Sequence, residues 1–171
     1  MDIDNDKYDY NTNDRIVTKL LVLDSQHRNT TLYPDTNNFQ IDLEKVNQAP
    51  LRDVLAIKLI KFDIYGGGLA LDKRSVYLRI NDYNHAIIGT ATINFAYANF
   101  ITNTNGLNFH DTSSVFLETD PNVYTFNPVR GNLRKFDVSI LNADGTLYDT
   151  KDHKVVITFA IYTKRNKYTR N

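Results

Sequence analysis

Histidine is the side chain in this sequence with the most capacity for metal chemistry, and its four copies stand far apart. They are His27, His85, His110 and His153. None belongs to an H-x-H or H-x-x-x-H pair. The metal of a catalytic jelly roll is held by two His at near-adjacent inward positions of one strand, with a carboxylate and a later His. We therefore predict no metal site and interpret each His as a loop residue or a surface polar group.

The sequence also contains no motif for nucleophilic catalysis or for phosphate binding. The chain has no cysteine, no G-x-S-x-G and no G-x-x-x-x-G-K-[ST]. The triple glycine Gly66–Gly68 lacks the helix start and lysine of a phosphate loop, so we interpret it as a flexible turn. Four scattered carboxylates lie at expected strand ends or outward positions, as solvated residues do: Asp24, Asp63, Glu118 and Asp137. We predict that the protein is not an enzyme and holds no cofactor.

Composition and charge favour one β-rich domain. A chain of 171 residues can bury roughly 70% of its unfolded surface in a single core. The 20 Lys+Arg balance the 20 Asp+Glu, so no net field draws the protein to nucleic acid or an anionic bilayer. Neither a signal peptide nor a membrane span is expected, because no long apolar stretch occurs. The 11 Tyr and 9 Phe suit pleated, half-buried surfaces.

The pattern of apolar residues predicts eight β-strands as the elements that position these side chains. No long stretch shows the apolar spacing of an amphipathic helix. A β-bulge is expected near Lys58–Ile60, where the inward parity changes. The Asn- and Thr-rich stretch Asn99–Ser114 reads as the longest loop, and Val123–Phe126 as a short extended piece. The last strand is the most apolar and is expected to be central. The expected strands are Ile16–Leu23, Asn38–Leu43, Val54–Ile64, Val76–Ile80, Thr92–Ala98, Val115–Thr119, Leu133–Leu141 and Val155–Thr163.

These strands predict an all-β fold, a single eight-stranded antiparallel jelly-roll sandwich. A ninth strand or a closed barrel is the alternative. We assign residues 15–163 to this domain, residues 1–14 to an acidic flexible N-terminal arm and residues 164–171 to a basic C-terminal tail. The arm and the tail have opposite charge, so they could meet within one chain or between subunits.

The polar turn after the first expected strand carries the most specific pattern. The chain reads DSQHRN at 24–29, LYP at 32–34 and NFQIDL at 38–43. Asp24 and Ser25 can cap the turn through bonds to backbone N–H groups, and Arg28 can bridge to Asp24 or to backbone carbonyls. Pro34 stiffens the return. Most of these residues are expected to set the loop between the first two strands.

This opening, L-x-x-D-S-x-x-R-N…Y-P-x-x-x-x-F-x-I-x-L before a Val/Leu/Ile-rich strand, resembles the start of small capsid proteins of nucleocytoplasmic large DNA viruses. The penton and minor capsid proteins of chlorovirus-like and mimivirus-like particles are similar. The resemblance covers about 30 residues, Leu21 to Leu43 plus the third strand. The chain departs from it at Gln26-His27, where a more acidic or smaller pair is expected.

The resemblance implies a single jelly roll in the virion capsid, made in the host cytoplasm. Five copies would close each fivefold vertex as a penton, or copies would lie under the shell as an internal minor capsid (cement) protein. The implied partners are other copies in a pentamer, the major capsid protein and other minor capsid proteins, with no nucleic acid and no membrane span. The two tails and the 99–114 loop are the candidate contact regions.

Two functions outside the capsid remain open. The 11 Tyr are compatible with a carbohydrate- or receptor-binding jelly-roll module, since tyrosine rings pack on sugars. A jelly-roll enzyme is the third alternative, and it would require a bound metal.

Overall fold

The computed structural model describes residues 15–46, 48–66, 75–83, 96–101, 106–111 and 122–165. This part of the chain contains β-strands and one short 3-10 turn, and it has no α-helix, which confirms the all-β prediction. The elements are β1 (Arg15–Asp24), η1 (Ser25–His27), β2 (Asn38–Asp42), β3 (Leu51–Tyr65), β4 (Ser75–Ile80), β5 (Ala98–Ile101), β6 (Gly106–His110), β7 (Val123–Leu133), β8 (Lys135–Leu141) and β9 (Lys154–Arg165).

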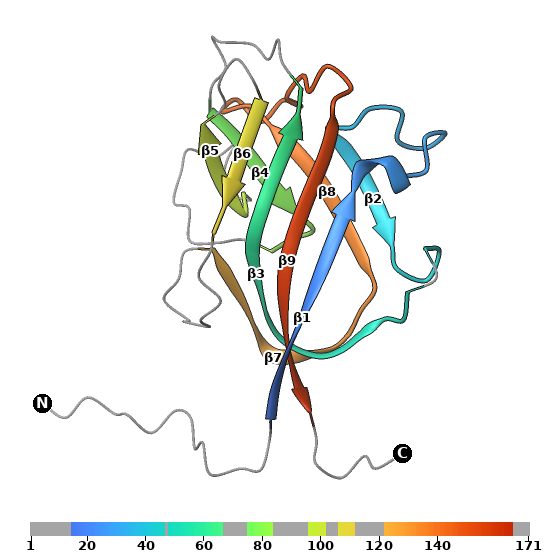
Figure 1. The fold of residues 1–171 in the computed structure, drawn as a ribbon, viewed down its shortest axis with the longest axis vertical. Coiled ribbons are helices and arrows are strands. Elements are labelled where there is room, and N and C mark those ends of the chain that lie inside the picture. Colours follow the sequence, from blue (N-terminus) through green and yellow to red (C-terminus); the bar gives the residue numbers. More distant parts are fainter. Residues whose placement is uncertain are drawn as a thin grey trace, which may run out of the picture.

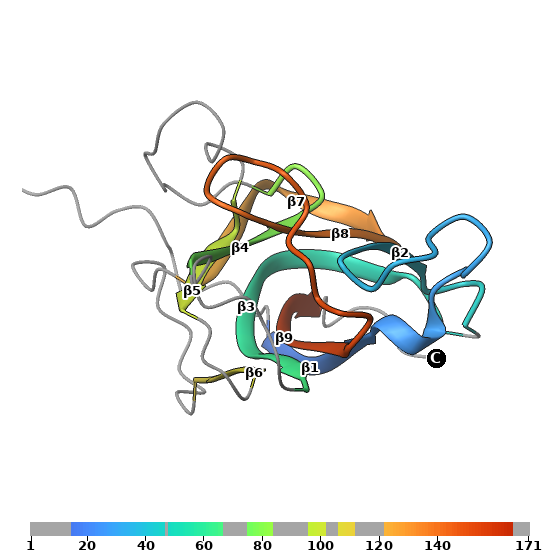
Figure 2. The same ribbon diagram turned by 90° about the horizontal axis from the view of Figure 1, so that it is seen from above.

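The strands form two sheets that face each other as a sandwich (Figures 1 and 2). Sheet A has the order β1-β9-β3-β6, and β7 also pairs with β3. Sheet B has the order β2-β8-β4-β5. Every recorded strand pair is antiparallel, so the predicted antiparallel sandwich is confirmed. The described residues hold nine strands, whereas eight were expected.

Six of the expected strands correspond to β1, β2, β3, β4, β8 and β9. The apolar β9 pairs with β1 on one side and β3 on the other, so its predicted central place is confirmed. The register of β3 against β9 shifts between Leu59 and Lys61, which confirms the expected bulge. A second shift lies between Val54 and Ala56. Each extra residue turns the following side chains to the opposite face.

The prediction of one long loop over 99–114 is wrong. β5 continues through Ile101, and Gly106–His110 forms β6, which pairs with the end of β3. Both are short edge strands whose polar residues point outward, so their composition resembles that of a loop. Asn99 is exposed between buried Ala98 and Phe100.

Two of the expected strands fall partly or wholly outside the described residues. Residues 92–95 of the fifth expected strand and all of the sixth, 115–119, lie outside the described residues. The short extended piece at 123–126 is the start of β7, which runs on to Leu133 and pairs with β3. Only Arg134 separates β7 from β8, so the chain passes from sheet A to sheet B within one residue.

Aromatic side chains from both sheets meet in the core between the layers. Phe62 of β3 packs edge-on against Phe100 of β5 at 5.0 Å between ring centroids, and Phe159 of β9 stacks with Phe136 of β8 at 6.3 Å. The buried Tyr97 hydroxyl donates to the carbonyl oxygens of Ile57 and Asn122, both at 3.0 Å. Each such ring stabilises the sandwich by about 1.5–3 kcal/mol through burial.

The ends of the chain fall mostly outside the described residues, including all of 1–14 and 166–171. β9 extends through Arg165, so the strand passes the predicted domain boundary at 163 by two residues. No helix in the described ranges is long and apolar enough to cross a bilayer.

Candidate interaction surface

The loop that carries the sequence motif is held by its own side chains. Asp24 accepts from the Gln26 N–H at 2.9 Å and caps η1, as expected. The Arg28 guanidinium donates to the carbonyl oxygens of Ser25, Tyr33 and Pro34 at 2.9, 2.9 and 2.6 Å. Arg28 was expected to bridge either to Asp24 or to backbone carbonyls, and the structure shows the bonds to carbonyls. Three charge-assisted bonds close the loop without a partner molecule.

The same loop is tied to sheet A through β9. Ser25 is fully buried, and its Oγ accepts from the Val155 N–H at 3.0 Å. Lys154 forms an ion pair with Asp24 at 2.7 Å. Burial alone would raise the pKa of Asp24, but the Lys154 ammonium and the Gln26 N–H outweigh it and hold that pKa below its ordinary value. Asp24, Ser25 and Arg28 of the motif therefore stabilise the fold.

The histidines remain separate in the fold, with His27 in η1, His110 at the end of β6 and His153 before β9. His85 lies outside the described residues. Within the described ranges, no three His, Asp or Glu side chains gather closely enough to hold a metal ion. The His153 ring lies against Gly66, where a Cβ would come within 2.3 Å of it.

The prediction that Asp63 is a solvated carboxylate is wrong, because its side chain is 1% exposed on β3. Asp24 is partly buried and Asp137 is exposed, while Glu118 lies outside the described residues. The structure does not bring Asp24, Asp63 and Asp137 together as an acid/base pair: they belong to β1, β3 and β8.

A buried lysine on β3 was missed by the sequence analysis. Lys58 is 0% exposed and pairs with Asp111, just after β6, at 3.2 Å. The sequence of this strand, which holds both Lys58 and Lys61, gives no sign that Lys58 is buried, because the side of the strand on which each lysine lies depends on two register shifts.

β1 is the feature of the described structure best suited to contact another protein. It forms one end of sheet A, and β9 is its only strand partner among the described residues. The register runs without a shift from Arg15 opposite Arg165 to Asp24 opposite Val156. A regular edge strand of 10 residues leaves its other row of N–H and C=O groups available for a neighbour.

The outward face of β1 is apolar and exposed. Ile16, Leu20 and Val22 are 46%, 71% and 58% exposed, with Thr18 between them. We call these three residues the β1 row. Leu23 on the opposite face is fully buried, so β1 has apolar side chains on both faces. Antiparallel strands with one solvated face normally alternate apolar and polar residues, and an apolar patch that faces water indicates a contact site.

The β1 row adjoins a buried apolar cluster on the outer face of sheet A. Leu20 lies opposite Ala160 and Thr18 opposite Tyr162 on β9. Ala160 and Tyr162 are 4% and 2% exposed and pack with Ala56 and Val123. Because Ala160 and Tyr162 are covered, the exposed β1 row borders buried apolar side chains towards the middle of the sheet.

β1 has few of the features that normally prevent an edge strand from pairing with another chain. Its sequence, RIVTKLLVLD, contains no proline and one lysine within the strand, Lys19. Proline, bulges, charge clusters and short length are the usual protections of an edge. The sequence could have shown the apolar residues on both parities of 16–23, but it could not show that this strand stands at an edge.

Charge adds to this surface at one end of β1. Residues 1–14 contain five Asp and one Lys, a net charge of −4, and residues 164–171 contain two Lys and two Arg, a net charge of +4. Because Arg15 lies opposite Arg165, the acidic segment enters and the basic segment leaves the domain side by side.

Comparison with known proteins gives this chain no relative: no family model matches the sequence, and no curated protein is detectably similar to it.

Proposed function

We propose that this chain is a structural capsid subunit, the penton protein that forms pentamers at the fivefold vertices of an icosahedral large DNA virus, with no catalytic role. The observation that carries the proposal is the apolar β1 edge, which has no second strand partner among the described residues, with its exposed β1 row. A long edge of this kind either binds a neighbour or promotes aggregation. The resemblance at residues 21–43 supports the viral assignment.

The strand pairing supports a jelly roll as the fold of this subunit. The antiparallel pairs β1–β9, β2–β8, β3–β6 and β4–β5 are nested one inside the next along the chain. Such nesting arises when one long antiparallel hairpin is rolled into two sheets, as in a jelly roll of two Greek keys. β7 and β8 then count as two arms of one strand that bends at Arg134 from sheet A into sheet B. On that count the strands number eight.

A ring of five copies requires a heterologous interface, in which one side of each copy fits a different side of the next. In the proposed pentamer the β1 row of one copy packs on a different surface of its neighbour. The free backbone groups of β1 add hydrogen bonds, and the acidic and basic segments beside it add charge attraction between copies.

The proposal is tested with the paired substitutions Leu20→Glu and Val22→Glu in the full chain. Two carboxylates on the β1 row would be buried without partners in an assembled interface, which is strongly unfavourable. We expect the wild-type protein to run as a pentamer by native mass spectrometry and the variant as a monomer with unchanged circular dichroism.

Leu147→Glu is the matched control, because Leu147 is also exposed and apolar, at 45%, but lies between β8 and β9, outside the candidate contact regions and the β1 edge. The control should assemble like the wild type. A wild-type chain that stays monomeric at high concentration and is missing from purified virions by mass spectrometry contradicts the proposal. So does a folded Leu20→Glu/Val22→Glu variant that still forms pentamers.

An internal minor capsid protein is the alternative within the same class, since the β1 edge could equally add to a sheet of the major capsid protein. That role predicts monomers in isolation which join only when major capsid protein is supplied. Pentamers of the purified chain would exclude it.

A further inference from the structure

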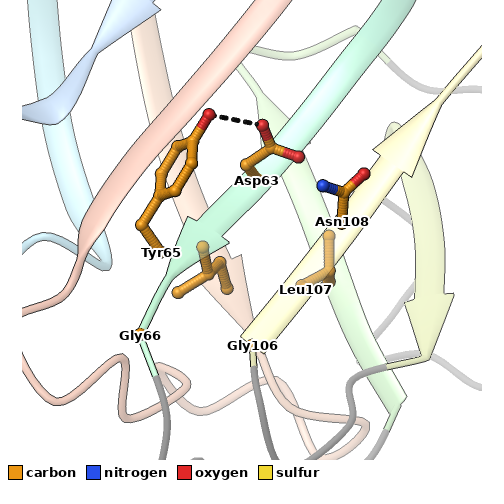
Figure 3. A pocket seen from close by; sticks show the side chains of 7 residues that line it. Asp63, Tyr65, Gly66, Gly106, Leu107 and Asn108 are labelled. Carbon is orange, nitrogen blue, oxygen red and sulfur yellow. Dashed lines mark hydrogen bonds between the residues drawn. The ribbon is translucent and has the colours of Figure 1, made fainter.

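Sheet A carries a small pocket where β3 ends and β6 begins, away from the β1 edge (Figure 3). Its volume is about 230 Å³, and Asp63, Tyr65 and Asn108 contribute polar atoms to its lining. Asp63 of β3 lies directly opposite Asn108 of β6. Pockets for drug-sized ligands start at roughly 300 Å³, so this one suits a single small ring or side chain.

One oxygen of the buried Asp63 carboxylate lacks a hydrogen-bond partner. Oδ2 accepts from the Tyr65 hydroxyl at 2.8 Å and pairs with Lys61 Nζ at 2.5 Å. Oδ1 is buried without a partner among the described residues. Figure 3 shows this oxygen directed away from Tyr65 and towards the Asn108 side chain. A buried acceptor left unpaired is unfavourable, so a ligand that donates to it removes that cost.

The charge of the pocket selects against ions. Lys61 neutralises Asp63, and its hydrogen bonds to Asp63 and then to Tyr65 raise the pKa of Lys61, which keeps it protonated. A second cation would meet a carboxylate that is already paired, and an anion would meet the carboxylate itself. The ligand that best suits the pocket is therefore a neutral molecule that donates a hydrogen bond.

Two glycines keep the pocket free of side chains. A Cβ on Gly106, whose φ is +120°, would lie 2.4 Å from the Ile64 carbonyl oxygen. A Cβ on Gly66 would overlap the His153 ring. Bare backbone therefore stands where β3 ends and β6 begins, and Leu107 adds an apolar part to the lining.

Tyr65 supplies an aromatic surface at the same place. Its side chain is 49% exposed, and Lys61 Nζ lies 5.7 Å from its ring centroid. Aromatic rings with a polar end suit ligands that are apolar on one side and hydrogen-bonding on the other. A pyranose ring has this character, with C–H groups on its face and hydroxyl groups around its rim.

We propose that this pocket binds one neutral pyranose residue of a glycan. A ring hydroxyl donates to Asp63 Oδ1, the Asn108 carboxamide donates to and accepts from neighbouring hydroxyls, and Tyr65 covers the C–H face. Asn108 is exposed, and such side chains change rotamer within nanoseconds, so it can turn aside to uncover Oδ1. The site is independent of the proposed capsid assembly.

The test is ligand-observed NMR of the full chain with free glucose, galactose, mannose and N-acetylglucosamine, followed by an array of neutral glycans. We expect at least one sugar to bind, with affinity lowered at least tenfold by Asn108→Ala and by Asp63→Asn. Asn132→Ala is the matched control, since Asn132 is an exposed Asn on β7 of the same sheet, and it should leave binding unchanged.

Because Asp63→Asn removes a buried charge and could disturb folding, the exposed Asn108→Ala variant decides the result. The proposal is overturned if no sugar binds, or if Asn108→Ala binds as tightly as the wild type. It is also overturned if Ca²⁺ alone occupies the pocket. Asn108→Ala should assemble normally, so a failure here is distinguishable from a failure of the capsid proposal.

Discussion

Arg28 and Asp24 show how single residues organise the motif loop without taking part in recognition. The Arg28 guanidinium donates hydrogen bonds to three carbonyl oxygens of its own loop. Asp24 joins that loop to Lys154 at the start of β9 through an ion pair. The residue types of this turn were sufficient to predict capping. The Lys154 partner could not be predicted, because it lies 130 positions away and only the β1–β9 pairing brings it close.

Asp24→Asn should reduce stability at neutral pH and change its response to acid. The folded-state pKa of Asp24 lies below the ordinary value of an aspartate, so its charge stabilises the fold at any pH above that ordinary value. The contribution disappears as pH falls through the folded-state value. We expect the variant to lose about 0.5–1 kcal/mol at pH 7, since Asn retains the cap but not the ion pair.

Urea denaturation at a series of pH values from 7 to 3 measures this effect. The difference between wild type and Asp24→Asn should shrink towards zero at the acid end. Asp35→Asn, a change at an exposed carboxylate later in the same connection between β1 and β2, is the control and should run parallel to the wild type. A difference for Asp24→Asn that stays constant with pH would contradict the assignment.

At the scale of elements, the long apolar strands were predictable and the short edge strands were not. β3 and β9 are rich in Val, Ile, Leu and Phe, which identify a strand whatever its neighbours are. β5 and β6 have four and five residues, and they exist because β4 and β3 offer them a pairing edge. Asn99 and Asn108 on the solvent side of these strands cannot be distinguished from loop residues by composition.

Gly106→Ala tests the close approach that lets β6 start beside the end of β3. The new Cβ would be 2.4 Å from the Ile64 carbonyl oxygen, at a backbone φ of +120°. We expect a loss of about 1–3 kcal/mol in the free energy of unfolding, measured by urea denaturation. Gly131→Ala on β7, where a Cβ meets nothing within 4 Å, should be neutral or slightly stabilising. Equal effects of the two substitutions would refute this account of Gly106.

At the scale of the whole molecule, the nested strand pairs bring the two ends of the domain together. β1 begins opposite the end of β9, so Arg15 and Arg165, 150 positions apart in the chain, lie side by side. The acidic residues 1–14 and the basic residues 164–171 join the domain at neighbouring positions, so their opposite charges favour contacts between copies as well as within one copy. Their effect on assembly should depend on salt, whereas that of the apolar β1 row should not.

Deletion of residues 1–14 should leave the fold intact and weaken assembly. The segment carries a net charge of −4 and few large apolar groups, so its loss should change the free energy of unfolding by less than about 0.5 kcal/mol. Analytical ultracentrifugation at low salt should show weaker association of the deleted chain. Raising the ionic strength to about 0.5 M, where the Debye length is a few ångströms, should bring the wild type towards it. Identical association of both chains at low salt would assign no assembly role to the segment.

The sequence by itself determined the all-β class, the main strands, the bulge in β3 and the capping of the motif turn, because these follow from side-chain periodicity and local hydrogen bonding. Tertiary structure alone decided that β1 is an edge, that Asp63 and Lys58 are buried, and that Asp63 faces Asn108. These features depend on sheet order and register, which are set by contacts between distant segments. A one-residue shift of register would have turned each of these side chains to the opposite face.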